Sequence, residues 1–417
     1  MDQRSTTGTH TDAKTVDGAT TEFEPDVMDL LVEALRGAVE RESPAVGTDT
    51  VLAALVMGDT DAGAATAPGI RVSGGLSGLI SGRAGRGWAD DDEGGAAPAA
   101  TDADALEVDA AWRDAQWRLG IGSRGSAPRS DRARPRMTGA LRTCLLLALA
   151  SARAEGTISV RCRHVARALV DLPCGRAREA LLLRGLDPAA AATALDALNA
   201  DASARSHGPE SRGVTLLRRA GTLGRSGNRL TRAIASWTSG AAQNGSPVLF
   251  AVSVEAVRQA VRRGRTEAEP VDLLLGVLAL DRALTVAGRS LPESLATANS
   301  AGTLLRRHGV RQASLTLAAV ASEPVPDITD VTRVRLSAAA DQAMAVARLT
   351  AAEHGSPTAG TVHLLAALLG VPAADADAEA GPGTEGAVSV VRLLRASGQV
   401  DTAGLLAELH LRLQDRS

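Results

Sequence analysis

Residues 336–370 read LSAAADQAMAVARLTAAEHGSPTAGTVHLLAALLG, and this stretch decides the predicted fold. Apolar residues such as Ala343 and Ala347 recur every three or four positions, which is the spacing of one face of a helix. Gly355 predicts the end of that helix, because glycine readily adopts the left-handed conformation that closes a last turn. Thr361 is expected to cap a second helix, HLLAALL, which is almost entirely apolar and is therefore predicted to be buried.

Variants of this pattern recur upstream, so we interpret the chain as an array of one repeated unit. A helical stretch, a turn and a second helical stretch follow one another in residues 27–56, 140–170 and 252–280. Two further helices separated by a glycine are predicted to complete three of the units. Their matched Leu/Gly pairs are Leu181/Gly185, Leu305/Gly309 and Leu394/Gly398.

The composition also favours helices. Hydrophobic residues make up 45% of the 417 residues, but aromatic residues make up only 1% and Tyr is absent. Small apolar side chains must therefore fill the core, which suits close-packed helices better than a β-sandwich. We predict an all-α fold made of four degenerate four-helix units. The predicted segments are a disordered tail (1–23), the first two units (24–200) with a flexible insertion (58–104), a partly helical linker (201–245) and the last two units (246–417).

The residues Gly360-Thr361-Val362-His363, followed by the Leu-rich helix, resemble the Gly-Thr-Glu-His motif of the Clp unfoldase amino-terminal repeat. The resemblance implies Clp-N-like double repeats that bind proteins. The implied partners are polypeptide clients or a subunit of a Clp unfoldase or protease. The motif positions that the resemblance implicates in protein binding are Thr48, Asp49, His164, Thr361 and His363.

In some members of that family the Glu of the motif, once per repeat, forms an acidic pocket that recognises phosphorylated arginine. The corresponding positions in this chain are Asp49, Arg163, Val271 and Val362. Only Asp49 keeps a carboxylate that could pair with a guanidinium group. An acidic residue in the first turn of a helix is also favoured by the helix dipole, which gives Asp49 a structural interpretation as well.

The commonest motifs for nucleotide binding and hydrolysis are absent from the sequence. No G-x-x-x-x-G-K-[ST] motif occurs, and the single lysine, Lys14, could not serve one. The resemblance therefore covers the amino-terminal module of the unfoldases and not their ATPase engine. G-x-S-x-G and H-E-x-x-H do not occur either. We predict a protein that is not an enzyme and needs no cofactor.

Two local patterns that resemble functional motifs have a structural interpretation instead. Residues 120–125 spell G-x-G-x-x-G, but they follow a helical run and enter a Pro/Arg linker, so we interpret them as a hinge. Cys162, His164 and Cys174 are the only cluster with metal-ligand side chains, and no fourth ligand is evident. We interpret them as core residues and predict no metal site.

The charge balance argues against a dedicated nucleic-acid binder. The chain has 45 Lys+Arg and 48 Asp+Glu residues, which gives a net charge of −3. Arg-rich stretches at 124–136 and 218–232 leave one alternative, a nucleic-acid-associated or regulatory helical protein. The polar N-terminus is unlike a secretion signal, and no apolar run would span a bilayer. We therefore predict a cytoplasmic protein without membrane contact.

Overall fold

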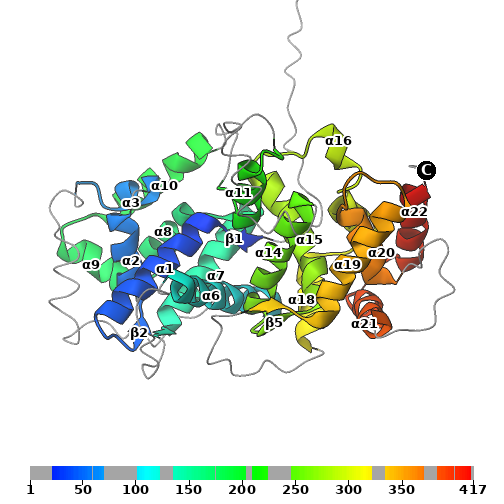
Figure 1. Cartoon of the computed structure of the whole chain (residues 1–417). Helices are drawn as coiled ribbons and strands as arrows, with labels where there is room; N and C mark the ends of the chain where they lie inside the picture. The colour runs from blue at the N-terminus through cyan, green and yellow to red at the C-terminus, as the bar shows by residue number, and fades with distance from the viewer. Residues whose placement is uncertain are drawn as a thin grey trace, which may run out of the picture.

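The computed structural model is mostly helical, and its short strands occur only in pairs between helices (Figure 1). It describes residues 21–58, 60–69, 101–122, 135–173, 175–202, 209–223, 246–321, 334–370, 383–398 and 400–414. An all-α fold is thus confirmed. The elements from blue to red in Figure 1 fall into a first half, up to α10, and a second half that begins at α11.

The first half contains two runs of the order strand, helix, strand, helix, followed by two more helices each. Its first run is β1 (Glu22–Phe23), α1 (Pro25–Glu40), β2 (Ala45–Val46), α2 (Thr48–Met57), α3 (Asp61–Thr66) and α6 (Asp102–Gly122). Its second run is β3 (Arg136–Met137), α7 (Gly139–Ala154), β4 (Ser159–Val160), α8 (Cys162–Asp171), α9 (Arg176–Leu183) and α10 (Pro188–Ala202).

The second half repeats much of this order. After α11 (Arg212–Arg219) its first run is α14 (Pro247–Arg262), β5 (Glu267–Ala268), α15 (Pro270–Val286), α16 (Glu293–Ala296), α17 (Ala301–Arg307) and α18 (Gln312–Ala321). Its second run is β6 (Arg335–Leu336), α19 (Ala338–Glu353), α20 (Thr361–Leu369), α21 (Gly383–Ala396) and α22 (Thr402–Gln414).

The strands join the runs reciprocally. In the first half, β1 precedes α1 and pairs in parallel with β4, which precedes α8 (Glu22↔Ser159). Conversely, β2 precedes α2 and pairs in parallel with β3, which precedes α7 (Ala45↔Arg136). In both pairs, the strand that precedes the first helix of one run therefore pairs with the strand that precedes the second helix of the other run. In the second half, β5 and β6 make the counterpart of the β2–β3 pair.

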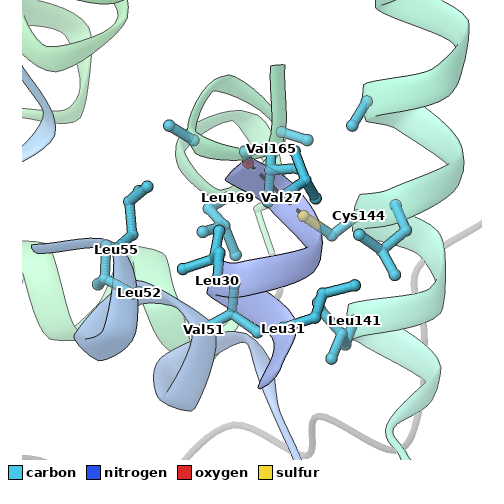
Figure 2. Close-up of a cluster of buried hydrophobic side chains, with 14 of the residues drawn as sticks. Val27, Leu30, Leu31, Val51, Leu52, Leu55, Leu141, Cys144, Val165 and Leu169 are labelled. Carbon is cyan, nitrogen blue, oxygen red and sulfur yellow. Dashed lines mark hydrogen bonds between the residues drawn. The ribbon is translucent and has the colours of Figure 1, made fainter. Parts of the chain in front are cut away.

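The apolar core of the first half lies where the first two helices of both runs meet. Figure 2 shows Leu31 of α1, Leu52 of α2, Leu141 of α7 and Leu169 of α8 grouped together, and each is 0% exposed. Each such side chain contributes roughly 1.5–3 kcal/mol of transfer free energy relative to an exposed position. A second, separate cluster fills the half that begins at α11.

Glycines shape the packing at two kinds of position. Gly185, Gly309 and Gly398 have φ values of +68°, +82° and +113° and lie between the last two helices of three runs, as the matched Leu/Gly pairs predict. Gly276 in α15 allows close packing on α14, because an added Cβ would lie 2.8 Å from the carbonyl oxygen of Val252. The close approach explains why this apolar helix tolerates a glycine in its interior.

Two predicted segments need correction. Glu22 and Phe23, placed in the disordered tail, form β1 and are 0% exposed. The insertion at 58–104 contains α3 and the start of α6, while its residues 70–100 lie outside the described part. The linker at 201–245, predicted to be partly helical, contains α11, which packs Val214 into the second core; residues 203–208 and 224–245 lie outside the described part. A few apolar side chains in these segments pack into the cores, although the segments as a whole are polar in composition.

Candidate functional site

The histidines at the Clp-like motif position cap the helices on which they lie. The Nδ1 atom of His164 accepts a hydrogen bond from the Arg161 backbone N–H at 2.9 Å, at the start of α8. His363 does the same for the Gly360 N–H of α20 at 3.0 Å. In α15 the carboxylate of Asp272 takes this role. These side chains accept a hydrogen bond from a backbone N–H group for which the helix has no backbone carbonyl, as the Glu of a capping box does.

The second ring nitrogen of His164 fixes its protonation. Because Nδ1 accepts a hydrogen bond, Nε2 carries the proton and donates to Glu155 Oε2 at 3.0 Å. His164 is 2% exposed, and this burial lowers its pKa. A second proton on the ring would remove the acceptor that caps α8. His164 is therefore a neutral structural residue near pH 7.

The motif threonines join one run of helices to the next. Thr48 Oγ1 accepts a hydrogen bond from the Ala177 N–H at 3.1 Å, in the first turn of α9. Thr361 Oγ1 accepts one from the Ala301 N–H at 3.3 Å, in the first turn of α17. Thr361 was expected to cap its own helix, and this was wrong. Gly360 is the N-cap of α20, and Thr361, one residue later, caps the neighbouring helix instead.

The positions of the family's Glu do not form an acidic pocket in the described structure. Asp49 is partly buried in the first turn of α2. Arg163 is paired with Glu155, with 3.0 Å between Nη1 and Oε1. Val271 and Val362 are 7% and 3% exposed, so at these positions the second half has neither a charged side chain nor one that a ligand could reach.

The structure also reveals a buried charged cluster between the two halves, which the sequence did not predict. Figure 1 shows β1, α6 and α14 meeting near the middle of the molecule. Within it, Arg282 of α15 reaches Glu22 and Glu24, at 3.1 and 2.9 Å. Arg258 of α14 reaches Asp114 of α6 at 2.7 Å. The first half contributes these carboxylates and the second half contributes the guanidinium groups.

A second set of contacts extends this cluster along α6. Arg262 Nη2 lies 2.6 Å from Glu107 Oε2, and Arg113 Nε donates to the backbone oxygen of Arg262 at 2.8 Å. Gln312 of α18 donates to Glu22. We call the whole set the seam cluster; its members are Glu22, Glu24, Glu107, Arg113, Asp114, Arg258, Arg262, Arg282 and Gln312.

The protonation of the seam cluster depends on its arginines. Burial alone would raise the pKa of Glu22, but Arg282, Arg262 and Arg258 together outweigh burial and lower it to about 2. For Glu24 burial prevails, and the pKa is raised despite Arg282. Buried ion pairs add little net stability compared with apolar residues, but loss of one partner is costly. The cluster therefore acts mainly by specifying how the two halves dock, and adds little net stability.

Sequence reasoning missed the seam cluster because its parts lie far apart in the chain. Glu22 lies 260 residues from Arg282 and follows a polar stretch. One local signal was present: Arg258 and Arg262 share a face of α14 at a spacing of four residues. Both lie in a helix whose other residues are mostly apolar, which would have been a reason to expect ionic partners.

No family model, curated protein or solved structure significantly matches this chain. Among the described residues, no helix is long and apolar enough to cross a membrane. The described part of the chain also contains no group of three His, Cys, Asp or Glu residues that could hold a metal ion. Cys174 of the Cys/His pattern lies outside the described residues.

The neutral cap of His164 predicts a pH dependence. In the unfolded chain the imidazole titrates near pH 6.5, whereas the native pKa is lower. As pH falls below about 6.5, the unfolded state takes up the proton first, and the free energy of unfolding decreases. His164→Gln keeps an acceptor without a titrating ring, so its stability should fall less between pH 7.5 and pH 5.5. Guanidinium unfolding at both pH values measures this difference.

The control for this prediction is His410→Gln, because His410 is exposed on α22. This variant should lose as much stability on acidification as the wild-type protein. Equal pH dependence in the His164→Gln variant would contradict the assignment of a buried neutral cap.

The seam cluster predicts a large effect of removing Arg282. Arg282→Leu leaves Glu22 and Glu24 buried without their nearest cation, which should reduce stability by about 3–5 kcal/mol. The exposed pair of Arg36 and Glu33 offers a control, and Arg36→Leu should cost under about 1 kcal/mol. Chemical unfolding measures both changes. Similar small losses in both variants would show that the cluster does not hold the halves together.

Proposed function

We propose that this chain is a non-enzymatic protein-binding module built like the amino-terminal double repeats of the Clp unfoldases. The observation that carries the proposal is the reciprocal joining of helical runs. Strand pairs link each run to the next in the first half, and β5–β6 repeats one of these links in the second half. The threonine bonds from α2 to α9 and from α20 to α17 add a second internal correspondence.

Exposed apolar side chains on the outer helices support a protein partner. Leu182 and Leu183 of α9 are 56% and 42% exposed, and Leu349 of α19 is 62% exposed. Val346 lies one helical turn from Leu349 and is 36% exposed. Single exposed apolar residues are common, but neighbouring ones on one helix provide area that a polypeptide can cover.

The proposed partners are unfolded polypeptide clients or a subunit of a Clp unfoldase or protease. In such an assembly the chain would act as an adaptor or regulator, because the motor would come from the partner. The binding role of Thr48, His164, Thr361 and His363 is then indirect. Their side chains hold helix ends in place, and the exposed apolar residues of α9 and α19 make the contact.

The alternative, a nucleic-acid-associated or regulatory protein, stays a prediction. Its Arg-rich stretches at 124–134 and 224–232 lie outside the described residues. Of the described arginines near them, Arg218 is paired with Glu210 at 2.8 Å. No described contact favours this alternative over a protein partner.

Binding to purified partners tests the proposal. Immobilised full-length chain is titrated with an unfolded polypeptide and with the Clp unfoldase and protease subunits of the same organism. We expect binding to at least one of them in the micromolar range, typical of regulatory interfaces. Leu182→Asp or Leu349→Asp should weaken that binding at least about tenfold, because each places a charge in a covered apolar contact.

The matched control is Glu353→Ala, which changes an exposed residue at the end of α19. It should leave binding unchanged. Absence of binding to all of these partners by a folded wild-type chain would contradict the proposed function.

A further inference from the structure

A small cavity lies beside the seam cluster, between α6 of the first half and α14 and α18 of the second. Its volume is about 50 Å³. A water molecule needs roughly 10–15 Å³ on a comparable measure. The cavity therefore has room for a few water molecules or for the polar head of a small ligand. It is too small for a nucleotide or a folded peptide.

Three buried polar atoms that line this cavity have no hydrogen-bond partner: Glu107 Oε1, Gln259 Nε2 and Arg262 Nη1. Gln259 is 2% exposed and Arg262 is 4% exposed. Arg262 Nη2 donates to Glu107 Oε2, which leaves Glu107 Oε1 without a hydrogen bond. Arg262 Nη1 makes no hydrogen bond either, although Asp114 Oδ2 lies 4.0 Å from it. A buried polar atom without a partner costs about 1–3 kcal/mol, which favours an occupant that supplies the missing bonds.

Arg113 adds a positive charge to the cavity wall. Its Nε is used by the backbone oxygen of Arg262, and no carboxylate within the described residues lies at ion-pair distance from its guanidinium group. Asp109 is close enough to raise the pKa of Arg113, but burial outweighs it and lowers the pKa. The carboxylate of Asp109 is itself paired with Arg142 at 3.1 Å. Water would leave this charge uncompensated, whereas an anion would neutralise it.

We propose that the cavity binds a short 2-hydroxy acid, of the size of glycolate or lactate. The carboxylate of the ligand accepts hydrogen bonds from Arg113, Arg262 Nη1 and Gln259 Nε2. The hydroxyl group donates to Glu107 Oε1. A methyl substituent lies against apolar residues of the cavity lining, such as Leu106 and Leu317.

Such a ligand would contact both halves at once. Arg113 and Glu107 belong to α6, whereas Gln259 and Arg262 belong to α14. Binding would therefore favour the arrangement in which the seam cluster is closed. The site is independent of the proposed protein-binding function, because it uses none of the exposed apolar residues on α9 or α19.

Titration of the full-length chain with sodium glycolate tests the proposal, with ligand-observed NMR to measure the dissociation constant. We expect saturable binding with Kd below about 10 mM, within the limit for a ligand of five heavy atoms. Acetate lacks the hydroxyl group and should bind at least about threefold more weakly. Glycolamide lacks the charge and, like sodium chloride at equal ionic strength, should show no saturable binding.

Arg113→Gln should weaken glycolate binding at least about tenfold, because it removes a charged hydrogen-bond donor. Gln259→Leu serves as a second variant with the same expected direction if Arg113→Gln does not fold. Arg36→Gln, on α1 and outside the cavity, should bind glycolate as the wild-type chain does. Absence of glycolate binding by the wild-type chain, equal binding by glycolamide, or only ordered water in a crystal structure at saturating glycolate would overturn the proposal.

Discussion

The structure depends on one constraint, the burial of helices that have almost no polar face. In α20, eight of the nine residues from Thr361 to Leu369 are buried. Such a helix cannot lie on a surface, so other helices must cover it on all sides. Its first backbone N–H groups are then cut off from water as well, and burial of unpaired donors is costly. His363 Nδ1 accepts one of these bonds, from the Gly360 N–H, and the neighbouring run accepts two more, through Asn299 Oδ1 and the Ala298 carbonyl oxygen.

The two halves meet by a different kind of interaction. The core of each half is an apolar cluster, whereas the surface between the halves contains the seam cluster. Arg282 and Arg262 are almost fully buried there and Arg258 is 12% exposed, and carboxylates from the first half pair with all three. Charges in such an environment tolerate few alternative arrangements, because each needs its partner at hydrogen-bond distance. The seam cluster thus specifies how the halves dock, and the apolar cores provide the stability of each half.

The helices and the repeated order of elements could be predicted from the sequence, because both follow from local spacing. The helix end near Gly355 and the Leu/Gly pairs were identified in this way. The role of Thr361 was missed, because its partner, Ala301, lies 60 residues away. The strand at Glu22 was missed for the same reason, since only its pairing with Ser159 makes it a strand. Local patterns describe what a segment can form, but they contain no information on which distant segment will complete it.

The central claim is that the helical runs of one half are stable only as a pair. The most direct measurement compares two fragments by circular dichroism and chemical unfolding: the paired runs, residues 21–202, and the second run alone, residues 135–202. The account predicts a cooperative transition and native-like helix content for the pair. It predicts no cooperative transition for the single run, because Val165 and Leu169 of α8 would lose their cover from α1 and α2. Cooperative unfolding of the single run with full helix content would contradict the claim.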